Sequence, residues 1–150
     1  MLNRRRHRAR TLHEALRSRE ATRNPLAHAC LMKRMATDFR DGKTFPRRGR
    51  EAAGGALWLL RVADKARASA NGTIHDYIYP CPMDLGVLER WQIPVEEFEA
   101  ALAHHSTDES LTAWLVERVP RERIERANAW LVHDKSSNLD RQDAEEVANA

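Results

Sequence analysis

The stretch FPRRGREAAGGALWLLRVADKARASA, which runs from Phe45 to Ala70, decides how the rest of the chain must fold. It contains the longest apolar block of the sequence and its only Gly-Gly pair, and a charged cluster follows directly. From Glu51 to Ala70 there is no proline, and Ala, Leu, Arg, Lys and Glu, which are good helix formers, predominate. We therefore predict one helix over residues 51–70, roughly five turns long, which Asn71 and Gly72 terminate.

This predicted helix is apolar on most of its surface. An apolar stripe runs along one face, and Trp58, Leu59 and Val62 widen it well beyond that face. A helix of this kind is usually buried at the centre of a protein. Gly54 and Gly55 would each cost about 1 kcal/mol relative to alanine inside a helix. We expect a neighbouring backbone to approach there too closely to leave room for a Cβ atom.

Charged residues occupy the second half of the predicted helix. Arg61, Asp64 and Arg67 follow one another at intervals of three residues. Lys65 lies one turn after Arg61, so basic side chains surround the carboxylate of Asp64. Two interpretations remain open. The cluster is either a solvent-exposed set of ion pairs, each contributing roughly a few tenths of a kcal/mol, or a site in which arginines keep Asp64 ionised beside a cleft.

Residues 73–82, TIHDYIYPCP, are the only segment with strand-like composition. No second strand signal lies nearby, so we predict an ordered, extended connector. If it is extended, His75, Tyr77 and Tyr79 lie on one side, where they could line a pocket with two hydroxyls and an imidazole. The alternative is that the tyrosines pack over the central helix and keep their hydroxyls in water.

The sequence predicts no metal or cofactor site. Cys81 lies near His75 and Asp84 in the sequence, but these three residues complete no recognised metal-ligand spacing. We therefore expect neither a metal nor a cofactor, and Asp84 enters only as a candidate ligand-binding residue. The full set of candidates is Arg61, Asp64, Lys65, Arg67, His75, Tyr77, Tyr79 and Asp84.

The central stretch also resembles a known family. The residues that carry the resemblance are Pro46-Arg47, Arg50-Glu51, Gly54-Gly55, Leu57-Trp58-Leu59, Arg61 and Asp64-Lys65-Ala66-Arg67-Ala68, followed by Gly72, Tyr77, Cys81-Pro82, Asp84, Leu88, Thr107-Asp108-Glu109 and Trp114. They are similar to a bacterial family of small domains of unknown function, whose members read approximately PRSPRE-x-x-GG-x-x-WL-x-R-x-x-DKARA. Arg48-Gly49 stands here for the Ser-Pro of that pattern, and Ala127-Asn128 for its Trp-Asn. The resemblance implies a compact helical domain over about residues 36–131 and no assigned activity.

Charge is distributed unevenly along the chain. Residues 1–34 carry ten Lys or Arg and two Glu, a formal charge of +8, whereas the whole chain carries +3, which leaves −5 for residues 35–150. We expect residues 1–34 to be a weakly ordered basic arm. Together with Arg47, Arg48 and Arg50, which precede the predicted helix, this arm could bind nucleic acid. Translation could equally begin at Met32 or Met35, in which case the arm is not part of the native protein.

The remaining sequence predicts short helices that prolines and capping residues separate. Pro94 and Pro120 start new segments, and apolar residues recur behind them at helical spacing. We predict an all-α fold in which short helices pack around the central one, as a small irregular bundle over residues 35–135. Residues 136–150 are polar, and we expect a mostly disordered tail or a frayed helix there.

Composition disfavours some classes of protein but does not identify the function. The two cysteines make no disulfide framework and no stretch is apolar enough for a membrane span, which together favour a cytoplasmic protein without membrane contact. We favour a small binding or interaction module for an anionic ligand or a protein partner, with a recess bordered by Arg61, Asp64 and Tyr77. The alternatives are a small enzyme with Asp64 or His75 as general base, and nucleic-acid binding through the basic arm. No P-loop, Rossmann loop or nucleophile motif supports the enzyme.

Overall fold

The computed structural model describes residues 37–148. The chain divides between Arg34 and Met35, and the expectations for residues 1–34, including weak order and binding of nucleic acid, lie outside the described residues. The described part contains six helices and no strand, only an isolated bridge between Ala53 and Ala56. The prediction of an all-α fold is confirmed.

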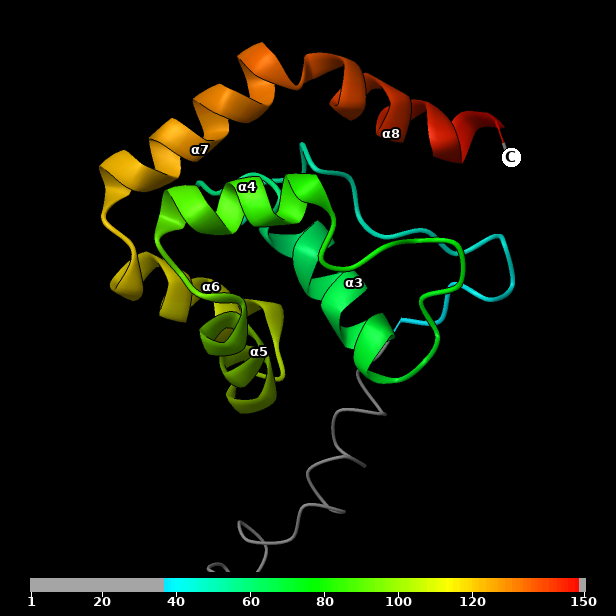
Figure 1. Cartoon of the computed structure of the whole chain (residues 1–150), viewed down its shortest axis with the longest axis horizontal. Coiled ribbons are helices and arrows are strands. Elements are labelled where there is room, and N and C mark those ends of the chain that lie inside the picture. The colour runs from blue at the N-terminus through cyan, green and yellow to red at the C-terminus, as the bar shows by residue number, and fades with distance from the viewer. Residues whose placement is uncertain (1–36, 149–150) are drawn as a thin grey trace, which may run out of the picture. The chain divides into compact units, whose positions relative to one another are not determined.

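In chain order the helices are α3 (Leu59–Ala70), α4 (Pro82–Trp91), α5 (Val95–His104), α6 (Asp108–Arg118), α7 (Arg121–Asp134) and α8 (Ser136–Ala148). From α4 onward, one to three residues separate each helix from the next. Figure 1 shows α7 and α8 following one another along one side of the domain, with α4 next to α7. The short connections force sharp reversals, so the helices form an irregular bundle.

The central helix begins at Leu59, and the prediction that it begins at Glu51 is wrong. Gly54 and Gly55 have φ angles of 58° and 78°, and Trp58 has φ 74°, which are left-handed values that a right-handed helix cannot contain. Ala53 and Ala56 exchange two backbone hydrogen bonds of 3.0 Å across the glycines, as in a tight hairpin turn. The two glycines therefore serve a turn. The expected close approach of a neighbouring backbone is wrong at Gly55, where nothing lies within 4 Å of an added Cβ atom; at Gly54 there is no room for a Cβ atom, but the close neighbours are side chains of α6.

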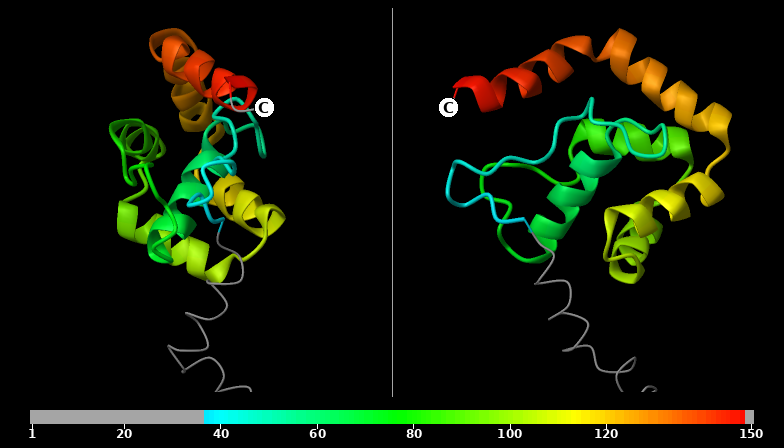
Figure 2. Two further views of the ribbon diagram at one scale, coloured as in Figure 1. Left: turned by 90° about the vertical axis from the view of Figure 1, so that its right-hand side faces the viewer. Right: turned by 180° about the vertical axis from the view of Figure 1, so that it is seen from behind.

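α3 is the buried centre of the domain. Every residue from Leu59 to Ala68 is buried, and Trp58, directly before the helix, is 1% exposed. Figure 2 shows α4, α5 and α6 arranged around α3. The apolar core that they share includes Val62, Ala63, Ala66, Leu88, Trp91, Phe98, Leu111, Leu115, Ile124 and Leu131. This arrangement confirms the buried central helix around which the fold was predicted.

The connector between α3 and α4, residues 73–81, contains no helix or strand, as predicted, but it is not extended throughout: turns lie at residues 75–76 and 79–80, and His75 has φ 55°. Its backbone is tied to other segments at its start. The Thr73 carbonyl accepts a hydrogen bond of 3.0 Å from the Phe39 backbone N–H, and the Thr73 hydroxyl donates to the Thr37 carbonyl at the same distance. The segment before Arg47 is therefore held against the end of α3.

The polar segment that follows α7 forms the helix α8. Of the two alternatives predicted for this segment, the mostly disordered tail is wrong for residues 136–148, and the helix is the closer one. Leu139 is fully buried and belongs to the core. It packs against Gly49, where an added Cβ atom would lie 2.8 Å from Leu139 and 2.5 Å from the Trp58 ring. The Gly49 backbone N–H also donates to the Gln142 side chain at 3.3 Å. These contacts, which join residues about ninety positions apart, order a segment whose own composition would not.

Gly54→Ala is expected to destabilise the domain more than Gly55→Ala. Both positions have positive φ, but only at Gly54 would a Cβ atom collide, at 2.6 Å from Thr112 Cγ2 and 2.8 Å from Val116 Cγ2; at Gly55 nothing lies within 4 Å. We expect the free energy of unfolding in urea to fall by about 2–4 kcal/mol for Gly54→Ala and by about 1 kcal/mol for Gly55→Ala. Equal losses would show that backbone conformation alone explains both glycines.

Candidate functional site

The four charged side chains of α3 are buried. Arg61, Asp64, Lys65 and Arg67 are each between 3% and 5% exposed, so the interpretation of a solvent-exposed set of ion pairs is wrong. Their side-chain hydrogen bonds and ion pairs run to other segments of the chain and not to one another. A buried charge is tolerated only when it is paired or hydrogen-bonded, so these partners matter to the whole fold.

Asp64 is held by Arg47, which comes from the segment before the Gly-Gly turn. The Nε and Nη2 groups of Arg47 donate to the two carboxylate oxygens of Asp64 at 2.9 and 2.8 Å, and the Arg47 backbone N–H donates to the same carboxylate at 3.0 Å. The guanidinium also donates to Asp108, at 2.6 Å from Nη1 and 3.0 Å from Nη2. The hydrogen bonds to Asp64, and then those to Asp108, raise the pKa of Arg47, and the Arg47 hydrogen bond lowers the pKa of Asp108. One arginine thus joins a buried carboxylate to a half-exposed one.

These residues border a recess of about 490 Å³ between the segment before α3, α3 itself and the start of α6. The side chains that line it are those of Thr37, Phe45, Arg47, Asp64, Arg67, Ser106, Thr107, Asp108 and Glu109. The Asp64 side chain is 7% exposed at its inner wall, and that of Asp108 is 42% exposed at its rim. The recess therefore contains positive and negative groups. Asp64, at its inner wall, is held by Arg47, whereas Asp108, at its rim, is accessible to solvent.

Arg67 is the cation in this recess with the weakest internal contacts. Its Nη2 donates one hydrogen bond of 3.3 Å to the His105 carbonyl, and its Nη1 lies 3.9 Å from Asp108. Burial lowers the pKa of Arg67, because the neighbouring carboxylates compensate the lost hydration only in part. Five N–H donors on a guanidinium that makes one long hydrogen bond leave capacity for a further partner.

Lys65 and Asp84 form a second buried group, at the start of α4. The Lys65 ammonium lies 2.7 Å from the carboxylate of Asp84, and their side chains are 4% and 0% exposed. Asp84 also accepts hydrogen bonds from the Trp58 indole N–H at 2.8 Å and from the Cys81 backbone N–H at 2.9 Å. With three donors already around it, this carboxylate is a structural anchor that ties α3 to α4.

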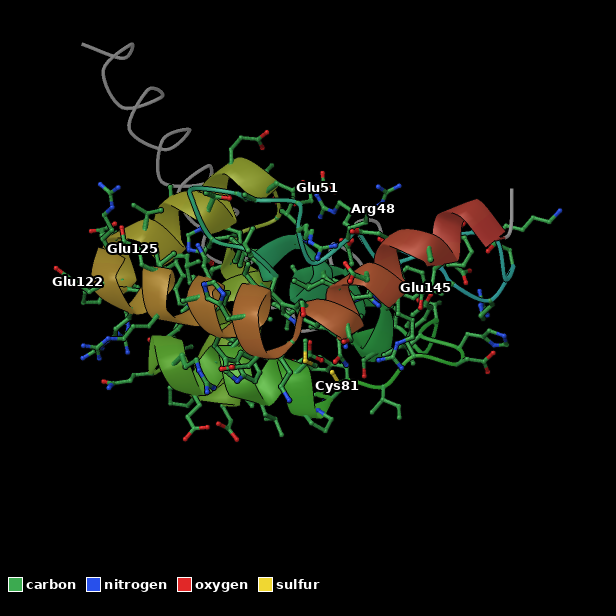
Figure 3. The ribbon with its side chains drawn as sticks, turned by 90° about the horizontal axis from the view of Figure 1, so that it is seen from above. Arg48, Glu51, Cys81, Glu122, Glu125 and Glu145 are labelled. Carbon is green, nitrogen blue, oxygen red and sulfur yellow. The ribbon has the colours of Figure 1, made fainter. Side chains whose placement is uncertain are left out.

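Arg61 faces a third direction, toward α8. Its guanidinium carbon lies 5.6 Å from the Trp58 ring centroid and 5.7 Å from that of Tyr77. The guanidinium donates to the carbonyls of Pro46 and Arg47 and lies 3.9 Å from Glu145. Figure 3 shows Glu145 on α8, the element that covers this side. Burial lowers the pKa of Arg61, and its buried Nε has no partner in the described part of the chain.

The connector residues do not gather in one pocket. Tyr77 adjoins Arg61, stacks edge-on with Phe39 and donates to Glu145 at 3.4 Å. Tyr79 packs on the core with its hydroxyl buried. The exposed His75 lies 3.3 Å from Asp76. None of the three lines the recess of Asp64 and Arg67.

Six of the eight candidates thus fall in three places, and the other two, His75 and Tyr79, belong to none of them. Asp64 and Arg67 line the recess, and Arg61 with Tyr77 faces α8. Lys65 and Asp84 form the internal pair. The recess expected at Arg61, Asp64 and Tyr77 is bordered instead by Asp64, Arg47 and Arg67, and a role for any of these residues in binding stays a prediction.

Sequence reasoning missed the partners that come from distant segments. Asp108 belongs to the Thr107-Asp108-Glu109 motif of the resemblance, which was the one available signal, whereas no pattern pointed to Glu145. Arg47 was predicted to contact nucleic acid with Arg48 and Arg50, yet its charge is balanced within the chain. Arg50 likewise pairs with Asp143 and, at 2.7 Å, with Asp140.

Within residues 37–148 no three His, Cys, Asp or Glu side chains are grouped so that they could hold a metal ion. The same part of the chain has no helix that combines the length and the apolar character needed to cross a membrane.

Comparison with known proteins identifies a family without an assigned activity. The family model described as Domain of unknown function (DUF5069) matches residues 43–149, which is most of the chain. Of the residues that line the recess, Thr37 alone lies outside the match. No curated protein matches the chain.

Asp84→Ala is expected to be strongly destabilising. It removes the shared acceptor of Lys65, Trp58 and Cys81 and leaves a buried ammonium without a counter-ion. We expect the free energy of unfolding in urea to fall by about 3–5 kcal/mol. The matched control is Asp38→Ala, which breaks the exposed ion pair with Arg40 and should leave stability nearly unchanged. Similar effects of the two substitutions would contradict the anchoring role of Asp84.

The two tyrosines are expected to ionise late. Burial, followed by the nearby Glu145 carboxylate, raises the pKa of Tyr77 to about 12, and burial also raises the pKa of Tyr79. Their pKa values are higher in the folded than in the unfolded chain, where tyrosine titrates near about 10. Stability should therefore hold up to that pH and fall as pH rises further. Phenolate absorbance will test this, because the chain has no other tyrosine; half-ionisation of both near pH 10 in the folded protein would contradict it.

Proposed function

The chain belongs to the DUF5069 family, and from that premise we propose that it is a small binding module whose recess takes a carboxylate-bearing ligand. One observation carries the proposal. Arg67 lines the recess with a side chain that is 5% exposed, yet within residues 37–148 that side chain makes only one hydrogen bond, of 3.3 Å. A buried guanidinium with spare donors gains from an anion that enters beside it.

The start of α6 supplies further donors at the same place. Asp108 and Glu109 are the first two residues of α6, and their backbone N–H groups make no hydrogen bond within the described residues. The N–H of Ser110, the third residue, donates to the Thr107 hydroxyl at 3.1 Å. Free N–H groups and the positive end of the helix dipole both favour a bound anion.

Asp108 indicates the class of ligand. Its carboxylate, 42% exposed, already lies against Arg47 at 2.6 Å and faces Arg67 at 3.9 Å. It therefore occupies the position that the carboxylate of a ligand would take, and because it lies at the rim it can turn outward. A ligand carboxylate that displaces it would contact both arginines in the planar, forked geometry that guanidinium groups favour.

Asp64 acts in this proposal as a positioning residue. It fixes the Arg47 guanidinium through two side-chain hydrogen bonds and a third from the backbone, and it is itself buried. All three hydrogen bonds come from Arg47, so the carboxylate of Asp64 is occupied in holding that side chain. The enzyme alternative with Asp64 or His75 as general base has no observation in its favour, since His75 is exposed away from the recess lining. We also propose a cytoplasmic location in a bacterial cell, which the absence of a disulfide framework in the sequence supports.

Binding can be tested with acetate, succinate and citrate, with chloride at equal ionic strength as reference. We expect at least one of these carboxylates to raise the melting temperature, with an effect that saturates as its concentration increases. At one hundred times its Kd, the added free energy of unfolding would be about 2.7 kcal/mol. Arg67→Gln should weaken binding about tenfold or more, and Arg67→Lys, which keeps the charge but not the fork, should lie between. Asp108→Asn should strengthen binding several-fold, because it removes the internal competitor.

Arg118→Gln is the control for charge. Arg118 lies at the far end of α6 from Asp108, and it pairs with Glu97 at 2.6 Å. This variant should bind as the unchanged protein does, and circular dichroism will show that each variant is folded. Absence of a saturable shift with any of the three carboxylates would contradict the proposal. So would a loss of binding that is as large in Arg118→Gln as in Arg67→Gln.

A further inference from the structure

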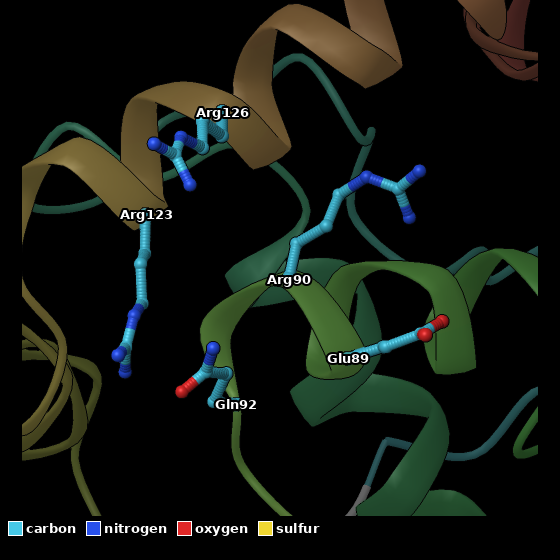
Figure 4. Close-up of a pocket in the computed structure, with 5 residues that line it drawn as sticks. All are labelled: Glu89, Arg90, Gln92, Arg123 and Arg126. Atoms are coloured by element: carbon cyan, nitrogen blue, oxygen red, sulfur yellow. The ribbon is translucent and has the colours of Figure 1, made fainter.

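We propose that a second recess, where the end of α4 meets α7, binds a phosphate group through Arg123 and Arg126. This recess has a volume of about 330 Å³, and its lining side chains are Glu89, Arg90, Gln92, Arg123 and Arg126 (Figure 4). It shares no lining residue with the recess of Arg67, so the inference is independent of the proposed function.

The charges of this recess are not balanced from within. Three arginines and one glutamate give it a formal charge of +2. The guanidinium groups of Arg123 and Arg126 form no ion pair or hydrogen bond in the described part of the chain. Arg121, one turn away, does find a partner, Glu125, at 2.9 Å. Two adjacent cations without counter-ions repel one another, and a bound anion would relieve that repulsion.

Arg90 gives the recess a fixed wall. Its guanidinium carbon lies 3.9 Å from the Trp130 ring centroid, and its Nη1 donates to the Gly86 carbonyl at 2.8 Å. Figure 4 shows the end of this side chain pointing away from Arg123 and Arg126. Arg90 thus adds positive charge and rigidity, while the donors free for a ligand are those of the other two arginines. The packing is tight, since a Cβ atom at Gly86 would lie 2.3 Å from Trp130.

Gln92 is a second and different sign of a site. It ends α4 with φ 56°, a left-handed conformation in which glycine or asparagine is usual. A glutamine there is held against its own backbone preference, and such positions concentrate at functional sites. Its amide, which can donate two hydrogen bonds, lines the recess on the side of Arg123 (Figure 4).

These groups specify the chemistry of the ligand. Two guanidinium groups three residues apart on one helix present forked donors to a compact oxyanion, and the amide adds a neutral donor. A phosphate group, with several acceptor oxygens and a charge near −2, matches them better than a single carboxylate does. The phosphate group can belong to inorganic phosphate or to a small phosphate ester. The ester carries an organic part next to the phosphate group, and inorganic phosphate does not.

The test is a titration of the full chain with inorganic phosphate and with glycerol 3-phosphate, followed by NMR of arginine Nε–H and glutamine amide signals. We expect saturable shifts of the Arg123, Arg126 and Gln92 side-chain signals that chloride at equal ionic strength does not cause. Arg123→Gln and Arg126→Gln should each weaken binding about tenfold. Arg121→Gln, which removes the same charge from the same helix, should leave binding within about twofold. Equal affinities for the two probes would indicate that the ligand is inorganic phosphate. Tighter binding of glycerol 3-phosphate would indicate that the ligand is a phosphate ester.

Gln92→Gly provides a readout that a merely structural role would not give. Glycine suits the left-handed conformation, so the variant should melt at a higher temperature while it binds phosphate more weakly. Shifts that do not saturate, or a loss of binding in Arg121→Gln equal to that in Arg123→Gln, would overturn the proposal. So would a Gln92→Gly variant that binds phosphate as tightly as the unchanged protein.

Discussion

The fold depends on supplying partners to the charges that its central helix buries. Taking an ammonium, a carboxylate and two guanidinium groups out of water costs several kcal/mol for each ion, and only close pairing recovers it. Arg47 reaches Asp64 across 17 residues and Asp108 across 61, and Asp84 meets Lys65 at the start of α4. The Asp64 and Lys65 pairs join α3 to two different segments, and the Arg47–Asp108 pair joins the segment before α3 to α6, so the ions specify how the segments are arranged around α3. A shift of any one segment would leave a charge buried without its partner.

The two recesses show what the same residue type does in different surroundings. Arg47 is saturated by two carboxylates and serves to hold the domain together. Arg67 is buried with a single hydrogen bond, and Arg123 and Arg126 are more exposed and have no carboxylate partner in the described residues. Incomplete pairing, more than the presence of arginine, marks the places where an outside anion would be stabilised. In both recesses a fixed residue, Asp64 in one and Trp130 in the other, holds a neighbouring arginine in place.

The sequence predicted the helical class and the buried central helix, because apolar periodicity and proline placement are local signals. The connector was predicted to lack a helix and a strand, but not to turn at His75, whose φ is 55°. The start of α3 was missed, since Gly54 and Gly55 read as helix-compatible until their positive φ angles are known. The order of α8, for which a frayed helix was only one of two alternatives, was underestimated because it comes from Leu139 and from contacts with Gly49 and Arg50, far away in the chain. The charged cluster was located correctly on α3, but its partners could not be derived, since pairing across 61 residues leaves no trace in spacing.

The attachment of α8 differs in kind from that of the other helices. Of its residues whose side chains are described, only Leu139 is fully buried, and the rest of its attachment consists of polar contacts made by Asp140, Gln142, Asp143 and Glu145. Dissolved salt weakens such polar contacts far more than it weakens apolar packing. The domain should consequently open first at this end, by local detachment of one helix while the core stays intact, and amide protons of α8 should exchange with solvent ahead of those in α3. That opening would bring Arg61 and Tyr77 to the surface, so the helix that detaches first is also the one that covers a buried cation whose Nε has no partner in the described residues.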